Sequence, residues 1–271
     1  MKNALTAILL LIAPGVIAGI GEPAAAGARM GGMANAGLVL PDIWTSLQNQ
    51  AALGWLQGVD AGVTYDNRYL MAQLSSVAAV AAMEVGNGAF GFNYSRFGYS
   101  AYREQKVGLA YGRKLSENFT VGVQLDYLRI ALGGGYGSTT AFTWEGGMQY
   151  AINKHVTLAA HVFNPIRVRL AEFNDERIPA TFKFGGSYRF SDRMVMLAQL
   201  QQTISEDPVV SAGLEYMMVD DFYVRAGVAG GAPSFAFGAG YAFSGFSIDI
   251  SSNYHQVLGF TPQLTLTYRG E

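Results

Sequence analysis

The chain contains no cysteine and only eight prolines, and charged residues make up just 14% of its 271 positions. Without cysteine it can form no disulfide framework, no cysteine-ligated zinc site and no thiol nucleophile. Soluble domains carry about 25% charged residues, and disordered or nucleic-acid-wrapping chains depend on an excess of charge. The formal net charge of −2 provides no basic field that would attract phosphates. These absences exclude disulfide scaffolds, thiol enzymes and nucleic-acid-binding proteins.

Glycine and aromatic residues are abundant instead. The chain has 34 glycines, 15 tyrosines and 16 phenylalanines, and half of all residues are apolar. Beyond the N-terminal region no run of 18 apolar residues occurs, so we expect no transmembrane helix in the mature chain. A composition rich in glycine, tyrosine and phenylalanine but poor in charge is typical of outer-membrane β-barrels.

The N-terminus has the form of a secretory signal peptide. Lys2 supplies a positive charge, residues 4–13 form an apolar stretch, and Pro14 interrupts it. Residues 16–18 and 24–26 offer small residues at two candidate cleavage sites. A membrane anchor is the alternative, but the apolar stretch is too short to span a bilayer. We therefore predict a signal peptide at residues 1–18 and export from the cytoplasm.

Residues 61–271 alternate between apolar and polar or small side chains with the period of a β-strand. In residues 246–254, for example, Phe246, Ile248 and Ile250 alternate with polar residues. The pattern predicts fourteen strands, approximately at residues 61–69, 70–84, 88–96, 105–112, 119–132, 141–151, 156–164, 177–190, 194–204, 208–217, 222–229, 233–242, 245–254 and 257–269. A soluble β-sandwich would also alternate, so the connections have to distinguish the two folds.

The connections alternate between short polar turns and longer loops. Residues 153–155, 191–193, 220–221 and 244–245 are short turns, whereas 133–140 and 165–176 are longer. An even number of strands with tight turns at one rim and longer loops at the other is the outer-membrane pattern. Aromatic side chains near the strand ends fit the interfacial girdles of such barrels. We predict a 14-stranded antiparallel transmembrane β-barrel.

Residues 19–60 do not alternate and are rich in glycine and alanine. Asp42 is suited to cap the N-terminus of a short helix that runs to about Asn49. Because small residues allow the backbone to pack tightly, we expect this segment to form a hatch, or plug, inside the barrel lumen. The predicted organisation is thus a signal peptide (1–18), a hatch segment (19–60) and an outer-membrane barrel (61–271).

The hatch segment resembles that of the FadL-like outer-membrane superfamily, and especially its PorV/PorQ branch. That branch opens with a Gly-Ala-Arg…Gly-Met-Gly…Ala pattern, followed by an aspartate and then Asn-Pro-Ala-Gly-Leu. The corresponding residues here are Gly27, Ala28, Arg29, Gly32, Met33, Ala36, Asp42, Asn49, Ala51 and Leu53. Residues 255–262, before the last strand, are also similar to the branch. The resemblance implies fourteen strands with an N-terminal plug and a role in the type IX secretion system.

Alternation places a set of charged side chains on the lumen face: Asp126, Glu145, Lys183, Arg189, Glu215, Arg225 and Asp249. They could form a hydrolytic site, but pairs that offset one another's charge in a polar lumen are the favoured interpretation. Arg29, the strong cation of the hatch, is expected to meet one of the inward carboxylates. His155, His161 and His255 lack the spacing of a shared metal site. We predict no catalytic residue, no metal site, no cofactor and no enzymatic activity.

Two classes of function remain. The main prediction, implied by the PorV/PorQ resemblance, is a component of protein export or surface attachment in a Bacteroidetes-type Gram-negative bacterium. Its partners would be outer-membrane lipid, secretion-system proteins or secreted cargo, and not nucleic acid. The alternative is a FadL-like passive channel for hydrophobic small molecules. The short, mostly polar or glycine-rich loops favour the first class, with residues 257–260 as an apolar exception.

Overall fold

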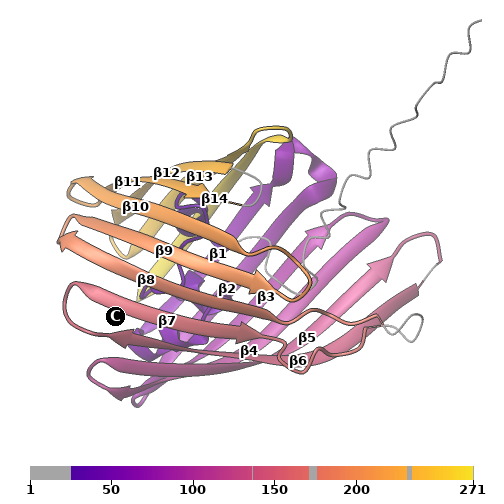
Figure 1. Cartoon of the computed structure of the whole chain (residues 1–271), viewed down its shortest axis with the longest axis horizontal. Coiled ribbons are helices and arrows are strands. Elements are labelled where there is room, and N and C mark those ends of the chain that lie inside the picture. Colours follow the sequence, from indigo (N-terminus) through magenta and orange to yellow (C-terminus); the bar gives the residue numbers. More distant parts are fainter. Residues whose placement is uncertain (1–25, 136, 171–175, 231–233, 271) are drawn as a thin grey trace, which may run out of the picture.

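The fourteen predicted strands close into one barrel (Figure 1). A computed structural model describes residues 26–135, 137–170, 176–230 and 234–270. The strands are β1 (Val59–Asn67), β2 (Ser75–Val85), β3 (Gly88–Gly98), β4 (Tyr102–Ser116), β5 (Phe119–Leu132), β6 (Gly137–Ala151), β7 (Val156–Phe163), β8 (Thr181–Ser191), β9 (Met194–Thr203), β10 (Val209–Val219), β11 (Phe222–Ala229), β12 (Ser234–Phe243), β13 (Phe246–His255) and β14 (Gly259–Gly270). Each pairs antiparallel with its neighbours in sequence, and β1 pairs with β14. The predicted fold class, a 14-stranded antiparallel barrel, is confirmed.

The two faces of each strand differ in the way that the alternation predicted. On β13, the apolar residue Ile250 is 55% exposed, whereas its polar neighbour Asp249 is 6% exposed. The aromatic residues that alternation assigns to the outside, among them Phe184, Tyr188 and Phe237, are likewise exposed. A barrel with apolar side chains outside and polar ones inside is arranged for a lipid bilayer.

The lipid face can be tested by placing the same charge on either side of the wall. Phe237 lies near the middle of β12 and is 51% exposed, so Phe237→Arg should cost about 2–4 kcal/mol of folding free energy in lipid vesicles. Ser247 faces the opposite side, at the short-turn rim, and Ser247→Arg should cost much less. Urea unfolding in vesicles measures both. Equal costs at the two positions would contradict the register, because a slip of one residue exchanges the faces.

The two rims differ in the lengths of their connections. Short turns such as Asp220–Asp221 and Ser244–Gly245 share one rim with the C-terminus, at the left of Figure 1. The longest connection, residues 164–180 between β7 and β8, lies at the opposite rim. In outer-membrane barrels the short turns face the periplasm and the long loops face the outside.

The predicted strands at residues 61–69 and 70–84 do not adjoin as expected. Two short 3-10 helices, η3 (Arg68–Leu70) and η4 (Ala72–Leu74), separate β1 from β2. Tyr69 and Leu70 have φ values of 56° and 57°, in the left-handed region that a β-strand excludes. A continuous apolar run, residues 69–72, covers this turn, and no glycine or proline marks it, which is why the sequence pattern did not reveal it.

Three further short helices lie inside the barrel: α1 (Ala28–Gly31), η1 (Ile43–Leu47) and η2 (Gln50–Trp55). Helix α1 contacts β12, β13 and β14, and η2 contacts β3 to β6 on the opposite side. The predicted signal peptide at residues 1–18 lies outside the described residues, as do residues 19–25 of the predicted hatch segment. Among the described residues, no helix is both long and apolar enough to cross a membrane.

Candidate functional site

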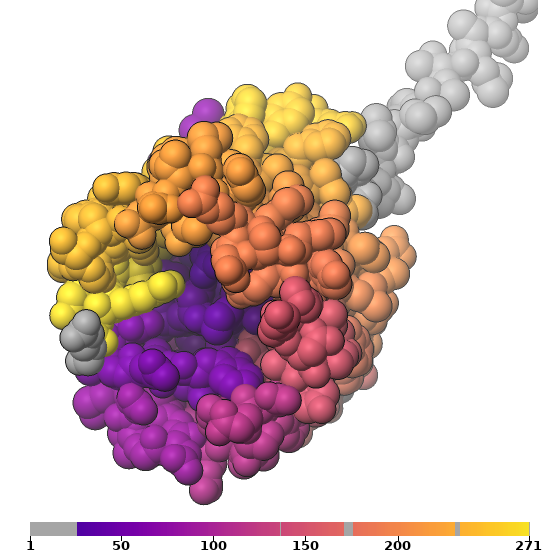
Figure 2. Space-filling view, turned by 90° about the vertical axis from the view of Figure 1, so that its left-hand side faces the viewer, coloured from indigo at the N-terminus to yellow at the C-terminus, as the bar shows by residue number. Residues whose placement is uncertain are grey.

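The lumen is filled by residues 26–56, which we call the inner segment. Most of its side chains are buried, including those of Met30, Met33, Leu47 and Leu53, although no part of it joins a β-sheet. Figure 2 looks into the short-turn rim and shows this indigo segment at the bottom of the central hollow. The location of the inner segment makes it the candidate functional site. Its predicted role as a hatch stays a prediction.

The barrel wall carries glycine at many of the positions that the inner segment approaches. At a set of inward positions, a Cβ atom would approach the inner segment more closely than the 3.4–4 Å of ordinary van der Waals contact. These positions are Gly62, Gly91, Gly112, Gly122, Gly147, Gly185, Gly213, Gly227 and Gly238. Met33, for example, packs against both Gly213 and Gly227. The wall is therefore shaped to receive this segment, since interiors pack without voids and tolerate little added volume.

Neighbouring residues of β11 provide a matched test of this fit. Gly227 faces the inner segment, and a Cβ there would meet the backbone of Met33 and Ala34, whereas Ala226 faces the lipid. Gly227→Val should weaken docking of the inner segment by about 1–3 kcal/mol through overpacking, while Ala226→Val should change little. Trypsin cleavage after Arg29, followed by mass spectrometry, reports the docking. Equal protection of Arg29 in both variants would show that the glycine wall does not hold the segment.

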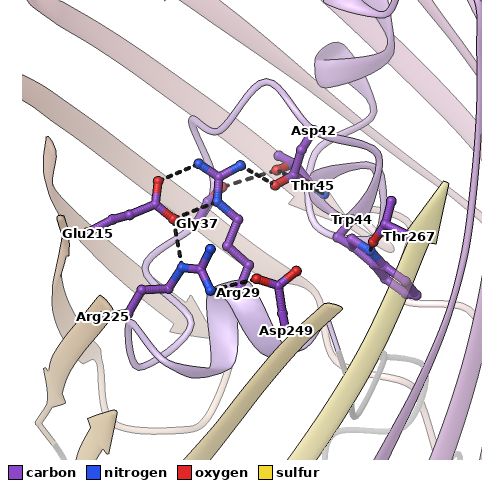
Figure 3. A network of polar contacts seen from close by, with 9 residues as sticks. All are labelled: Arg29, Gly37, Asp42, Trp44, Thr45, Glu215, Arg225, Asp249 and Thr267. Atoms are coloured by element: carbon purple, nitrogen blue, oxygen red, sulfur yellow. Dashed lines mark hydrogen bonds and ion pairs between the residues drawn. The ribbon is translucent and has the colours of Figure 1, made fainter. Parts of the chain in front are cut away.

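Arg29 anchors the inner segment to the wall through charged hydrogen bonds (Figure 3). Its Nε and Nη2 atoms donate to the two carboxylate oxygens of Glu215 on β10, at 2.8 and 2.6 Å. Its Nη1 atom donates to Asp42 Oδ2 at 2.8 Å. Arg29 thus meets one of the carboxylates that alternation had placed inside the barrel, and it also meets a second carboxylate within the inner segment.

The wall continues this chain of charges. Arg225 on β11 donates through Nε to Glu215 Oε2 at 2.7 Å and through Nη1 to Asp249 Oδ1, on β13, at 2.6 Å. Three carboxylates and two guanidinium groups therefore alternate, and each buried charge has a partner of opposite sign, as burial requires. Burial alone would lower the pKa of Arg29, but Glu215 and Asp42 raise it above its ordinary value. Arg29 consequently stays charged at any physiological pH.

Asp42 and Asn49 also shape the inner segment locally. Asp42 Oδ1 accepts a hydrogen bond from Thr45 N at 3.1 Å and caps η1. The expected helix from Asp42 to about Asn49 is thus a 3-10 helix that ends at Leu47. Asn49 caps η2, and its Nδ2 donates to the carbonyl oxygens of Leu38 and of Met148 on β6.

The other residues that carry the PorV/PorQ resemblance also lie where the inner segment meets the wall. The backbone N–H of Ala28 donates to Thr265 Oγ1 at 2.7 Å, and Gly32 packs against Gly238. Leu53, on η2 beside Ala51, packs against Gly91 and Gly112. Gly27 has a φ of 84° and lies against Trp44, whose indole N–H donates to Thr267 on β14.

A second buried polar cluster lies between the inner segment and the long-loop rim. Lys106 on β4 donates to Glu145 Oε1 at 2.8 Å and lies 3.4 Å from Asp126 Oδ1. Gln124 donates to both of these carboxylates, and His161 Nε2 is 3.2 Å from Glu145 Oε2. We call these five residues the Lys106 cluster. All of them are buried.

The structure distributes the predicted lumen residues over different parts of the lumen. Glu215, Arg225 and Asp249 belong to the Arg29 chain, and Asp126 and Glu145 belong to the Lys106 cluster. Lys183 is buried beside His161, its partner in the β7–β8 register. Arg189 is exposed at the short-turn rim. Lys106 was missed, although it shares the inward face of β4 with Gly108, Ala110 and Gly112 and could have been found from that alternation.

The described residues between β7 and β8, 164–170 and 176–180, pack apolar side chains against the strands. Leu170 and Ile178 from the loop pack with Leu128, Ile130 and Phe163 from the strands. Asn164 holds the loop in place, because its Nδ2 donates to Ile178 O and its Oδ1 accepts from Val168 N. The strand expected from residue 177 begins at Thr181 instead, since residues 176–180 follow this fold of the loop.

Two cavities lie on either side of the inner segment. A cavity of about 380 Å³ opens at the short-turn rim and is lined by Leu40, Pro41 and Trp55 of the inner segment and by Arg189 and Tyr223 of the wall. The hollow of Figure 2 opens at this same rim. A smaller polar cavity of about 230 Å³ at the opposite rim is lined by Asn35, Asp66 and Asn253, among others. Within the described residues, no group of three or more His, Cys, Asp or Glu side chains could hold a metal ion.

A closed barrel with an apolar exterior and a filled lumen defines a protein of the outer-membrane barrel class. No protein-family model matches the chain, and no curated protein sequence matches it. Solved structures do. A monoaromatic hydrocarbon channel, CymD, aligns with a TM-score of 0.69 and 14% identity over 90% of this chain and 97% of that one.

Two further solved structures are similar. The Pseudomonas aeruginosa FadL homologue aligns with a TM-score of 0.65 and 13% identity, and the Ralstonia pickettii toluene transporter TbuX with 0.65 and 14%. Both alignments cover 90% of this chain and 98% of the other. At such identities the likeness shows the fold, which is that of FadL-type outer-membrane barrels. Among these neighbours are a hydrocarbon channel and a toluene transporter, and the apolar exterior of this barrel fits the same outer-membrane class. The PorV/PorQ branch and a Bacteroidetes source stay predictions.

Proposed function

We propose that this protein is an outer-membrane channel for small hydrophobic molecules, and that the inner segment closes its lumen at rest. The proposal takes up the alternative of the sequence analysis in place of its main prediction. The observation that carries it is the fold, shared with a monoaromatic hydrocarbon channel and a toluene transporter, combined with a lumen filled by a segment of the chain. Hydrophobic compounds need such a protein because the polar surface of an outer membrane excludes them.

The lumen supplies two features that such a channel requires. A buried apolar cluster, in which Leu170 and Ile178 pack on strand residues, lies at the outer end of the lumen, which the sequence had led us to consider polar. The inner segment separates the two cavities but is held without a covalent bond, since the chain has no cysteine. A molecule that travels from one cavity to the other must displace part of this segment.

A reversible crosslink tests the channel and the gate together. Leu38 Cβ lies 3.1 Å from the position of a Cβ on Gly185, close to the roughly 3.5–4.5 Å between the Cβ atoms of a disulfide. The double variant Leu38→Cys, Gly185→Cys should take up radiolabelled toluene only after reduction, when produced in a Gram-negative host that lacks hydrocarbon channels. The two single variants serve as controls. Equal uptake by oxidised and reduced protein would refute gating, and uptake no higher than in the empty host would refute the channel.

A second candidate, a component of type IX secretion, is favoured by one observation. The residues that carry the PorV/PorQ resemblance, among them Arg29, Asp42 and Asn49, are also those that hold the inner segment to itself and to the wall. A barrel that is permanently closed suits a protein-binding role better than a channel. Affinity purification of the tagged protein from outer membranes distinguishes the two. Stoichiometric recovery of secretion-system proteins, with no toluene uptake, would favour this candidate.

The proposed location has its own expected result. The protein should fractionate with outer membranes and migrate faster on gels before heating than after, because a closed hydrogen-bonded barrel resists detergent until it is heated. Membrane fractionation followed by gel electrophoresis of unheated and heated samples measures both properties. Recovery in the soluble periplasmic fraction without detergent would contradict an outer-membrane barrel.

A further inference from the structure

An apolar groove of about 800 Å³ runs across the outer surface of the barrel over β2 to β6. Its sides are outward side chains that include Ala81, Met83, Phe90, Leu109, Leu125 and Trp144. Its floor is formed where the wall carries little side-chain volume, at Gly91, Ala82 and Ala110. The groove lies on the opposite face of the wall from η2 of the inner segment.

The groove lies at the depth of one leaflet. Phe90 on β3 pairs with Tyr111 on β4. Two residues closer to the short-turn rim, Gly88 pairs with Arg113. From Arg113 to Leu109 the strand rises by four residues, about 13 Å along its own axis and about 10 Å along the membrane normal at the usual tilt of roughly 35–45°. Half of a bilayer's hydrocarbon core is about 15 Å thick. Because the short turns face the periplasm, the groove faces the acyl chains of the periplasmic leaflet.

An exposed cation lies just beyond the groove, toward the short-turn rim. Arg113 is two residues past the lining residue Tyr111 on the same outward face of β4, and it is exposed. Two acidic side chains in the neighbouring turns are engaged elsewhere: Glu84 accepts from Gly58 N, and Glu117 pairs with Lys114. An apolar groove of acyl-chain depth that ends at a guanidinium matches the two parts of a phospholipid, since guanidinium groups bind phosphate through paired hydrogen bonds.

We propose that this groove is a binding site for one phospholipid of the periplasmic leaflet, with an acyl chain between Ala81 and Leu109 and the phosphate at Arg113. Such a lipid is held longer than the lipids that surround the rest of the barrel. It braces the β2–β6 side of the wall, whose inner face carries η2.

Native mass spectrometry tests the site with a defined probe, palmitoyl-oleoyl phosphatidylglycerol added to the detergent-purified full chain. The parent protein should retain one lipid after release from the micelle. Arg113→Gln should weaken retention about tenfold, the loss expected when a phosphate loses a charged hydrogen-bonding partner. Ala81→Phe should abolish retention, because the ring fills the groove.

Matched variants elsewhere on the barrel serve as controls. Ala239 lies on the lipid face of β12 between Phe237 and Tyr241, and Ala239→Phe should leave retention unchanged. Arg193→Gln removes an exposed cation from a turn at the same rim and should also have no effect. Equal retention in Ala81→Phe and Ala239→Phe would overturn the site. A dimer that is lost in Ala81→Phe would also overturn it, by showing that a second copy of the chain fills the groove.

Discussion

Replacing Arg29 with alanine should open an ion-conducting path through the lumen while the barrel itself stays folded. Glu215 retains Arg225 as a partner, but Asp42, whose side chain is 2% exposed, loses its ion pair. Stranding one member of a dry ion pair typically costs about 3–5 kcal/mol. The side chain of Arg29 is 21% exposed to the short-turn cavity, and water there reduces this cost. The substitution therefore weakens the docking of the inner segment and not the barrel, since the strands keep their own hydrogen bonds.

Conductance in planar bilayers measures this effect directly. The Arg29→Ala protein should leak small ions more than the parent does. Arg193→Ala, which removes an exposed cation from the same rim, should leave conductance unchanged. Adding Asp42→Asn to Arg29→Ala removes the stranded charge and should recover part of the closure. Unchanged conductance in Arg29→Ala would mean that this ion pair does not hold the gate.

The fold was predictable because alternation and turn chemistry act over a few residues. Ile250 and Asp249 differ in polarity and therefore in face, and the dipeptide Ser244–Gly245 marks the turn between β12 and β13. Strand pairing in a simple up-and-down barrel then follows from chain order. The errors occurred where backbone conformation departed from side-chain pattern. Tyr69 and Leu70 adopt left-handed backbone within an apolar run, and residues 176–180 follow a loop held by Asn164.

The candidate site was only partly predictable, because alternation fixes the face of a residue but not its height along the barrel axis. Arg29 had to meet a carboxylate because a guanidinium keeps its charge. Nothing in the sequence distinguished Glu215 from Asp126 as the partner. Arg189 shares the lumen face with Lys183, yet one is exposed at the rim and the other is buried. The glycines of the wall that contact the inner segment are also not recognisable from the sequence, since nothing there distinguishes them from the other glycines of the strands.

Replacing Lys106 with methionine should be the most damaging single change in the barrel wall. Lys106 is the cation between Asp126 and Glu145, which come from adjacent strands and are both buried. Its Nζ also lies 4.8 Å from the ring centroid of Phe163, a favourable cation–π distance. Without it, two carboxylates face each other in the lumen, and the cluster retains only the neutral Gln124 amide and His161 beside them. Leaving a buried charge unpaired typically costs about 3–5 kcal/mol. Because these residues belong to the strands, the cost lowers the free energy of unfolding of the barrel itself.

Urea unfolding in lipid vesicles should show the Lys106→Met midpoint well below that of the parent. The triple variant Lys106→Met, Asp126→Asn, Glu145→Gln keeps the shapes but removes the charges, and it should recover most of the stability, because an intact buried ion pair is often worth little more than a neutral replacement. Lys154→Met, in the exposed turn between β6 and β7, is the control for losing a positive charge. If the single and triple variants unfold together, packing of the Lys106 side chain rather than its charge stabilises this part of the wall.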